Sequence, residues 1–334
     1  MHTHMPVSIL KPLHGMEPRL YQNLRSFCLQ DYPRFQLLFG VRDEADPALA
    51  VARRIQGEFP HLDIAAVVDA RLHGHNFKVS NLTNLLQHAR HPWLVIADSD
   101  ICVGRDYLQR VCAPLTRPDV GIVTCLYRGR ALGGLWSRLG ALFINEWFAP
   151  AVRIAQLFGS RAFGFGATLA LRRETLDAIG GFQCIVNELA DDYRLAERTR
   201  DAGLVTVLSD YVVTTDVAET SARQLMVHEL RWMRTIRMLN PLGYTCMVIS
   251  FGPPVAAIGA ALAGWAADAL LLLALTCISR AVLHFAAAQR TPRWPWHAGC
   301  SLPLIVLRDA LNLILWGVAF TRRQVTWAGR ELHL

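Results

Sequence analysis

Acidic residues gather at two places in this sequence, and an Arg-Trp pair follows them. In chain order these residues are Asp98, Asp100, Asp191, Asp192, Arg231 and Trp232. The first two close the apolar run 93–97, so we expect them at the carboxyl end of a buried strand, where α/β sheets bind ligands. Two carboxylates one residue apart can share a hard cation. We therefore predict that Asp98 and Asp100 bind Mg²⁺ or Mn²⁺, which would neutralise a diphosphate leaving group. The alternative is an ordinary polar turn.

The later residues add the other parts of a group-transfer site. Asp192 follows a Gly-Gly-Phe turn and is the predicted general base, with Asp191 beside it to adjust its pKa. The alternative is a pair of acids that favours the first turn of a helix over 190–202. Arg231 can bind a diphosphate through bidentate hydrogen bonds, and Trp232 can wall a sugar site. The segment 223–237 also has the pattern of a basic helix at a membrane surface, and both interpretations can hold. Together these residues favour sugar transfer from a nucleotide diphosphate.

Two further polar residues suit donor binding. Asp43 closes the run 35–41 and can accept hydrogen bonds from a nucleobase or ribose; Glu44 and Asp46 we interpret as acids at a helix start. Lys78 follows Gly74 and precedes a helix, so it can reach a phosphate. It is one of only two lysines in the chain. The alternative for Lys78 is a surface lysine without a ligand.

Alternating strands and helices must position these residues. We expect strands at 7–10, 35–41, 62–68, 93–97 and 120–125, and helices at 20–29, 47–59 and 79–89. Asp46 before Pro47 is a predicted N-cap. The pattern predicts an α/β fold with a mainly parallel sheet. A segment at 135–148 is helical in pattern, with Pro150 expected to end or kink it.

Composition divides the chain into two parts. It has 334 residues, 52% of them hydrophobic, and its mean hydropathy of +0.24 is high for a soluble domain. We expect a cytosolic catalytic domain at 5–240 and membrane helices with a basic tail at 241–334. The net charge of +7 suits anionic lipid and nucleotide phosphates, and no basic stripe with aromatics predicts nucleic-acid binding. The eight cysteines lack zinc-like spacing, and the start of the chain has no signal-peptide pattern.

The apolar region predicts two membrane spans, at 246–263 and 269–288. A third segment, 302–320, is interrupted by Arg308-Asp309, and its remaining apolar part is too short to cross a bilayer. We expect it to be interfacial or re-entrant. The tail, with Arg322, Arg323 and Arg330, would then lie on the cytoplasmic side with the catalytic domain.

Several short motifs, in order, resemble the ceramide glucosyltransferase family. Its bacterial relatives include the hopanoid biosynthesis-associated glycosyltransferase. The similar segments are 11–15, 42–47, 76–82, 98–99, 191–193, 231–232, 308–309 and 325–330. His228 stands where the family has Gln or Arg, three residues before Arg231. Family members usually begin with a membrane helix, and we find none before residue 10.

The resemblance implies a GT-A fold, a nucleotide-sugar donor and a membrane lipid acceptor, with inversion at the anomeric carbon. It implies that Asp43, Asp98 and Asp192 are the three family aspartates, with Asp192 as the base, and that Lys11 contacts the donor. An Arg- and Ala-rich composition is typical of GC-rich bacteria. We therefore expect a hopanoid polyol acceptor ahead of ceramide, UDP-GlcNAc ahead of UDP-glucose, and a bacterial inner membrane with the site on the cytoplasmic side.

Two other functions are compatible with parts of this pattern. A processive polysaccharide synthase has a similar pattern of aspartates followed by an Arg-Trp pair, but two or three membrane segments can hardly build a polymer channel. A non-catalytic scaffold that binds nucleotide sugar would not need the three acids Asp98, Asp100 and Asp192.

Overall fold

The computed structural model describes the backbone of residues 5–289, 298–321, 324–327 and 330–333. The chain separates into two compact units, each described by itself below. The first comprises Met1–Arg130 and Ala151–Asp216, and the second comprises Ala131–Pro150 and Val217–Leu334. Parts of the expected catalytic domain 5–240 thus share a unit with the apolar segments. A functional boundary at residue 240 stays a prediction.

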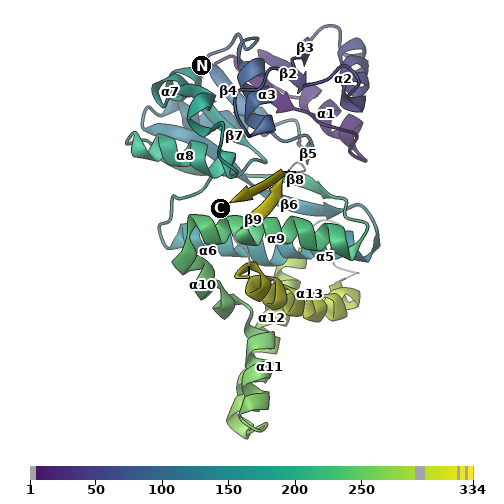
Figure 1. Cartoon of the computed structure of the whole chain (residues 1–334), viewed down its shortest axis with the longest axis vertical. Helices are drawn as coiled ribbons and strands as arrows, with labels where there is room; N and C mark the ends of the chain where they lie inside the picture. The colour runs from purple at the N-terminus through teal and green to yellow at the C-terminus, as the bar shows by residue number, and fades with distance from the viewer. Residues whose placement is uncertain (1–4, 290–297, 322–323, 328–329, 334) are drawn as a thin grey trace. The chain divides into compact units, whose positions relative to one another are not determined.

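The first unit is built on an eight-stranded sheet with the order β3-β2-β1-β4-β7-β6-β8-β5 (Figure 1). Its strands are β1 (Val7–Pro12), β2 (Phe35–Val41), β3 (Asp63–Val68), β4 (Trp93–Ile96), β5 (Ile101–Cys102), β6 (Val120–Ala131), β7 (Leu169–Arg172) and β8 (Val205–Val217). The first four are parallel, as predicted, and β7 is antiparallel to both β4 and β6. The strand order therefore reverses between β1 and β4, which is where an open α/β sheet forms its ligand crevice.

Helices connect the strands and cover the sheet. They are α1 (Leu20–Cys28), α2 (Pro47–Glu58), α3 (Phe77–Leu86), α4 (Tyr107–Cys112), η1 (Ala113–Thr116), α7 (Arg173–Ala178), η3 (Gly181–Ile185) and α8 (Asp191–Asp201). The predicted N-cap is confirmed, because the Asp46 carboxylate accepts a hydrogen bond from the Ala48 N–H.

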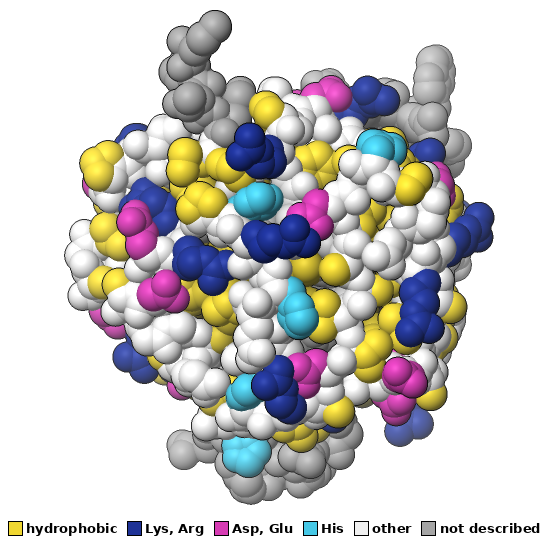
Figure 2. All heavy atoms as spheres, turned by 90° about the horizontal axis from the view of Figure 1, so that it is seen from above, with side chains coloured by type: hydrophobic (Ala, Val, Ile, Leu, Met, Phe, Trp, Pro, Cys, Tyr) yellow, Lys and Arg dark blue, Asp and Glu magenta, His cyan; other side chains and the backbone are white. Residues whose placement is uncertain are grey.

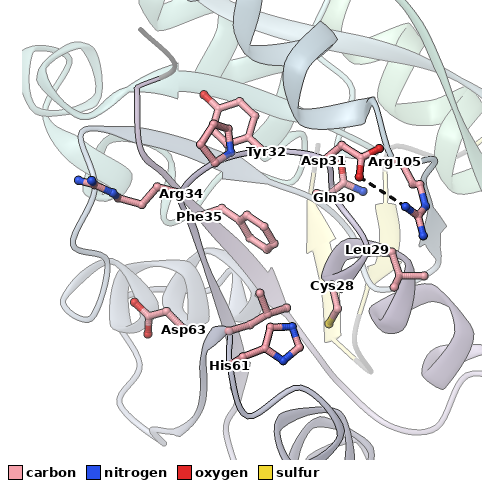
Figure 3. Close-up of a pocket in the computed structure, with 12 residues that line it drawn as sticks. Cys28, Leu29, Gln30, Asp31, Tyr32, Arg34, Phe35, His61, Asp63 and Arg105 are labelled. Atoms are coloured by element: carbon pink, nitrogen blue, oxygen red, sulfur yellow. Dashed lines mark ion pairs between the residues drawn. The ribbon is translucent and has the colours of Figure 1, made fainter.

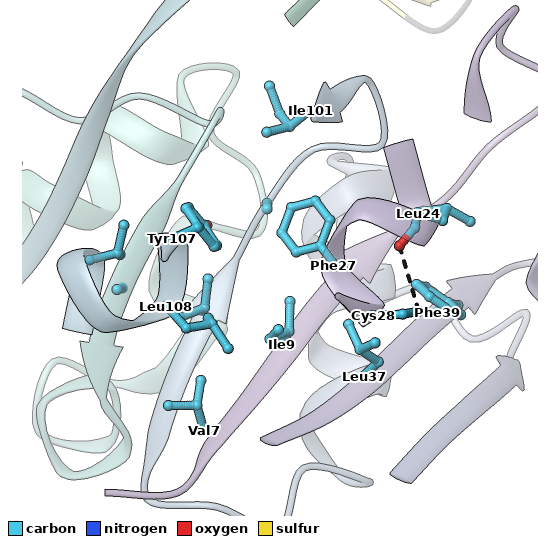
Figure 4. Close-up of a cluster of buried hydrophobic side chains, with 14 of the residues drawn as sticks. Val7, Ile9, Leu24, Phe27, Cys28, Leu37, Phe39, Ile101, Tyr107 and Leu108 are labelled. Atoms are coloured by element: carbon cyan, nitrogen blue, oxygen red, sulfur yellow. Dashed lines mark hydrogen bonds between the residues drawn. The ribbon is translucent and has the colours of Figure 1, made fainter. Parts of the chain in front are cut away.

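Both faces of the parallel strands are buried. One core contains Ile9 of β1, Leu37 of β2, and Phe27 and Tyr107 from α1 and α4 (Figure 4). The other contains alternate strand residues such as Leu10, together with residues of α3 and α8. Alternate residues of one strand thus enter opposite cores, as the side-chain period of two requires.

The second unit is mainly helical. It contains α5 (Gly134–Phe143), η2 (Ile144–Phe148), the start of α6 (Ala149–Leu157), α9 (Ala222–Leu239), α10 (Pro241–Cys246), η4 (Met247–Ser250), α11 (Gly252–Leu262), α12 (Ala267–Gln289), α13 (Ala298–Ala319) and the hairpin β9 (Gln324–Trp327) and β10 (Arg330–His333).

Pro150 was expected to end or kink the helix at 135–148, and the structure shows that the helix does not end there. The chain continues as one helical run from α5 through α6, and η2 is a π-helical turn in which the Ala149 N–H bonds to the Ile144 carbonyl. A proline ring clashes with the carbonyl four residues earlier in a regular α-helix. The π turn directly before Pro150 is wider than an α-helical turn and accommodates the proline within the helical run.

One expected membrane span, 269–288, agrees with the structure, and the other two segments differ from expectation. α12 over Ala267–Ala287 and α13 over Leu302–Ala319 are long and apolar enough to cross a bilayer. α13 is continuous through Arg308-Asp309, because both charged side chains are buried within this unit rather than exposed along the helix. The segment expected to span first instead belongs to two helical pieces, Pro241–Ser250 and Gly252–Leu262, bent by 73°. Arg322 and Arg323 of the tail lie outside the described residues.

Surface charge is mixed on the face seen from above in Figure 2, where basic and acidic side chains are interspersed with apolar ones. On that face the positive net charge is therefore not gathered into one basic patch.

Candidate active site

The carboxyl ends of β1 and β4 bring the central residues of the site together. Asp98 follows β4, and Lys11 lies near the end of the neighbouring β1. The Lys11 Nζ donates to the Asp98 backbone carbonyl at 2.8 Å and lies 3.7 Å from the centre of the Phe27 ring. Because the Lys11 side chain is fully buried, it supports the turn that carries Asp98. The expected contact of Lys11 with the donor stays a prediction.

Lys78 bridges the two acidic segments. Its Nζ lies 2.7 Å from Asp98 Oδ1 and 3.3 Å from Asp191 Oδ2. Lys78 enters from the first turn of α3, which is capped by Asn76. The Asn76 amide also donates to the Glu188 carbonyl at 2.8 Å, and so ties the start of α3 to the loop before α8. The predicted residues Lys78, Asp98 and Asp191 are therefore in one cluster.

Asp192 is the second residue of α8 and directly follows Asp191 of this cluster. Its Oδ2 accepts the Gly166 N–H at 2.7 Å, and its Oδ1 accepts the Tyr193 N–H at 2.8 Å. A Cβ at Gly166 would lie 2.7 Å from Asp98 Oδ2 and 3.4 Å from Asp192 Oδ2. Only glycine therefore lets the backbone pass this close to Asp98 and Asp192.

Asp100 lies two residues after Asp98, directly before β5. Its carboxylate accepts a hydrogen bond from the hydroxyl of Thr215 in β8. Ser99 between the two acids donates to Glu17 Oε1 at 2.6 Å, which fixes the turn. Among the described residues, no group of three or more His, Cys, Asp or Glu side chains is arranged to hold a metal. The binding of a cation by Asp98 and Asp100 stays a prediction.

Burial and neighbouring charges shift several pKa values here. Burial raises the pKa of Asp192 to about 6, with help from the Asp191 carboxylate and opposition from Lys78. Burial and the Asp98 carboxylate raise the pKa of Asp100 to about 7. Burial alone would lower the pKa of Lys78, but the surrounding carboxylates outweigh it and raise that pKa, so Lys78 stays charged.

Lys11 is the exception among the basic groups. Burial lowers the pKa of Lys11 to about 7, although the Asp100 and Asp98 carboxylates oppose the change. The pKa of Lys11 is thus lowered while that of Lys78 is raised, because Lys78 has carboxylates in direct contact and Lys11 does not.

Three predicted residues are not part of this cluster in the contacts above. Asp43 follows β2, is exposed, and accepts the Ala45 N–H at 2.9 Å in a local turn. Arg231 and Trp232 lie on α9 in the second unit. There the His228 ring stands edge-on to Trp232 at 4.6 Å, and its Nδ1 lies 2.6 Å from Glu219 Oε1.

Sequence reasoning missed Asn76, Gly166 and Thr215. Asn76 had a usable signal, since Asn before a helix is a typical N-cap. Gly166 had only the pattern Gly-Phe-Gly at 164–166, which does not say what the glycine approaches. Thr215 lies 115 residues from Asp100, and no local pattern predicts their pairing.

A cavity of about 470 Å³ lies elsewhere in the first unit (Figure 3). It is lined by residues 28–35, 61–63 and Arg105. Phe35 begins β2 and Asp63 begins β3, so the cavity is at the amino ends of these strands. The carboxylate cluster follows the carboxyl end of β4, and the cavity is thus at the opposite edge of the sheet.

Comparison with known proteins gives the family of this chain. The model of glycosyl transferase family 21 matches residues 1–334. The chain belongs to glycosyl transferase family 21. It is 25% identical over 229 residues to "Ceramide glucosyltransferase 1" of Caenorhabditis elegans, covering 68% of this chain and 49% of that protein. It is 33% identical over 116 residues to "Ceramide glucosyltransferase" of Komagataella phaffii, covering 33% and 23%.

The chain spans about half the length of the Caenorhabditis relative. Among solved structures, it is similar to a mannosyltransferase from Pyrobaculum calidifontis in complex with GDP-Man and Mn²⁺. The TM-score is 0.61 at 20% identity, with 96% of this chain and 86% of that one covered. The expected GT-A type α/β fold is thereby confirmed.

Proposed function

We propose that this family 21 protein transfers a sugar from a UDP-sugar to a hydroxyl of a membrane lipid. The observation that carries the proposal is the cluster of Lys78, Asp98, Asp191 and Asp192 beside the point where the strand order reverses. It combines a cation for phosphate with a carboxylate that can take a proton. The helices α12 and α13 are long and apolar enough to cross a bilayer, which supports a lipid acceptor.

The donor would bind at the ends of β1, β2 and β4. Asp98 and Asp100 would hold Mg²⁺ or Mn²⁺, as the Mn²⁺ in the similar mannosyltransferase supports. Burial and the nearby Asp98 carboxylate raise the pKa of Asp100, and a bound cation would offset both effects. Such an ion neutralises negative charge on a diphosphate leaving group. Asp43 would contact the nucleobase or ribose, and Lys11 would keep Asp98 in place.

The remaining donor contacts would come from basic and aromatic side chains. Lys78 would exchange a carboxylate for a phosphate oxygen when the donor binds. Arg231 would bind the diphosphate through two parallel hydrogen bonds, and Trp232 would form one wall of the sugar site. Asp191 would keep Lys78 oriented during this exchange, since the two are already paired.

Asp192 would act as the base of a single displacement. Its carboxylate takes the proton of the acceptor hydroxyl while that oxygen attacks the anomeric carbon. The bond from this carbon to the UDP oxygen breaks, and its electron pair leaves with UDP. Attack from the side opposite the leaving group inverts the anomeric centre. The backbone N–H groups of Gly166 and Tyr193, which donate to the Asp192 carboxylate, would fix its orientation during the transfer.

Within the class of membrane lipids we propose a hopanoid polyol as acceptor and UDP-GlcNAc as donor, with UDP-glucose second. The bacterial type of composition supports the hopanoid. The names of the curated relatives support ceramide as the competing acceptor. We place the enzyme in a bacterial inner membrane with the site on the cytoplasmic side.

One assay separates these possibilities. The purified full chain in detergent is given each lipid with each UDP-sugar and divalent metal, and products are identified by mass spectrometry. We expect a glycosylated hopanoid polyol. Glucosylated ceramide as the sole product would overturn the acceptor but keep lipid glycosylation. A free polymer, or UDP-sugar binding without any turnover, would overturn the proposed function.

A further inference from the structure

The end of α6 presents an apolar surface to solvent. Ile154, Leu157 and Phe158 are 55%, 86% and 88% exposed. Their spacing of three and four residues puts them on one face of the helix. Val152 is buried on another side, so α6 is packed against the protein through the opposite face. A group of large side chains this exposed marks an interaction surface.

Two arginines flank this surface. Arg153 and Arg161 are exposed, and neither guanidinium makes a hydrogen bond or ion pair with another residue that the structure describes. Apolar side chains between arginines are typical of helices that lie in the headgroup region of a bilayer containing anionic lipid. We call these five residues the α6 tip: Arg153, Ile154, Leu157, Phe158 and Arg161.

The α6 tip is held in a defined conformation. The Ser160 N–H bonds to the Ala155 carbonyl at 2.9 Å, and the Gly159 N–H bonds to the Gln156 carbonyl at 3.0 Å. Gly159 has a φ of +86°. This is a Schellman motif, which closes a helix with glycine in the left-handed conformation. Leu157 and Phe158 are therefore presented by a closed helix end and not by a frayed one.

A short segment connects the tip to the proposed base. Phe163 is buried, and its carbonyl accepts a hydrogen bond from Arg200 Nη1 at 3.1 Å. Gly166, eight residues after Phe158, donates its N–H to Asp192. The tip and the carboxylate cluster belong to the same compact unit. One anchored loop thus joins the exposed apolar surface to the site.

We propose that the α6 tip inserts into the headgroup region of an anionic bilayer. Ile154, Leu157 and Phe158 enter the boundary of the acyl chains, while Arg153 and Arg161 bind lipid phosphates. The candidate spanning helices α12 and α13 support a membrane location for the protein. The tip thereby holds the tail of the acceptor lipid near the loop that ends at Asp192; this consequence rests on the proposed function.

The insertion is tested with an environment-sensitive fluorophore on Phe158→Cys, in full-length protein whose exposed cysteines are replaced by serine. The protein is reconstituted into vesicles of phosphatidylcholine with a minority of phosphatidylglycerol. We expect a blue-shifted emission that lipids brominated near the headgroup quench. The same label on Ala50→Cys, an exposed position of α2, should report water.

Two results of this experiment would overturn insertion. One is an aqueous signal from position 158 in vesicles. The other is a shift that depends on protein concentration in the absence of lipid, which would mean that a second copy covers the tip. Neither result depends on whether the protein transfers sugar.

Turnover tests the functional consequence. The double variant Leu157→Asp with Phe158→Asp should lower kcat/KM for a lipid acceptor in vesicles by about tenfold or more, because two apolar side chains no longer enter the lipid. UDP binding should be unchanged. Phe158→Leu should keep full turnover, as should Val212→Asp, a matched change of an exposed apolar residue on β8. Full turnover of the double variant would overturn the role of the tip, and no turnover by unmodified protein would count against the proposed function alone.

Discussion

At the scale of single residues, the site depends on how charges are shared among four carboxylates and two lysines. Lys78 forms ion pairs with Asp98 and Asp191, and Lys11 donates to the Asp98 backbone carbonyl. Asp192 is left without a salt bridge among the described residues and accepts only backbone N–H groups. This difference in partners is what separates the proposed base from its neighbours.

Replacement of Asp192 tests this assignment. Asp192→Asn removes the proton acceptor but keeps the shape, so we expect unchanged UDP binding and a loss of about 10²–10⁴ in turnover. Asp191→Asn should disturb Lys78 and weaken donor binding more than the chemical step. An inactive Asp191→Asn beside an active Asp192→Asn would reverse the two roles.

The pH dependence gives a second test of the same residue. The pKa of Asp192 is raised to about 6, and the base must be deprotonated. Activity should therefore be present above about pH 6 and be lost as the pH falls through that value. The measurement is kcat/KM against pH at saturating metal. A profile that is flat from pH 5 to 8 would contradict Asp192 as the base.

Replacement of Asp98 tests the proposed metal site. Asp98→Ala removes one of two proposed ligands and frees Lys78, so we expect metal-dependent UDP binding to be lost in calorimetry. Asp177→Asn, an exposed acid on α7, is the control and should bind as the unmodified protein does. Unchanged metal-dependent UDP binding by Asp98→Ala would exclude this metal site.

At the scale of secondary-structure elements, buried ion pairs join the helices of the second unit. Arg308 of α13 donates to both oxygens of Glu229 in α9 at 2.7 Å. Arg280 of α12 bonds to Glu146 at 2.9 Å and to Asp309 at 2.8 Å. Glu146 lies in the π turn η2 and also contacts His284 Nδ1 at 2.7 Å. Charges within apolar helices are tolerated here because each has a partner.

The Glu229–Arg308 pair can be tested by a double-mutant cycle. Arg308→Met leaves Glu229 buried and unpaired, which typically costs about 3–5 kcal/mol. We expect Arg308→Met to unfold at a lower midpoint than the unmodified protein when unfolding in detergent is monitored by tryptophan fluorescence. Glu229→Gln with Arg308→Met removes both charges and should recover part of the loss. Equal midpoints for all variants would mean that the pair contributes nothing to stability.

The elements also show what the sequence could predict and what it could not. β1 to β4 were predictable, because strands buried on both faces are continuous apolar runs, and Asp98 followed from the end of one run. β8 was missed because its residues alternate between buried and exposed, which leaves no such run. Gly166 could not be foreseen, since its contact with Asp192 depends on how the loop before β7 is placed. The pairing of Arg308 with Glu229, 79 residues away, could not be predicted either. For that reason Arg308-Asp309 was wrongly expected to interrupt the helix.

At the scale of the whole molecule, the number of helices that cross the bilayer determines on which side each connecting segment lies. If α12 and α13 cross and the bent pair α10–α11 does not, Gly264 and the C-terminus lie on the cytoplasmic side and residues 290–297 on the other. If the bent pair also crosses, all three positions change sides. The basic tail favours the first arrangement.

Reporter fusions distinguish the two arrangements. A reporter active only in the periplasm is placed after Gly264, within 290–297, or after Leu334. We expect a signal only from the middle position. Signals from the first and last positions, with none from the middle one, would establish three spans and a tail opposite to the one we propose.

The buried ion pairs also set an order for biogenesis. Arg280 pairs with Glu146, Arg308 with Glu229, and Asp309 with Arg280. In every case the partner precedes the intramembrane charge in the sequence. As the ribosome delivers α12 and then α13 to the insertion machinery, the counter-charge for each has already been synthesised. Neither helix should therefore insert stably when it is produced without the residues that precede it.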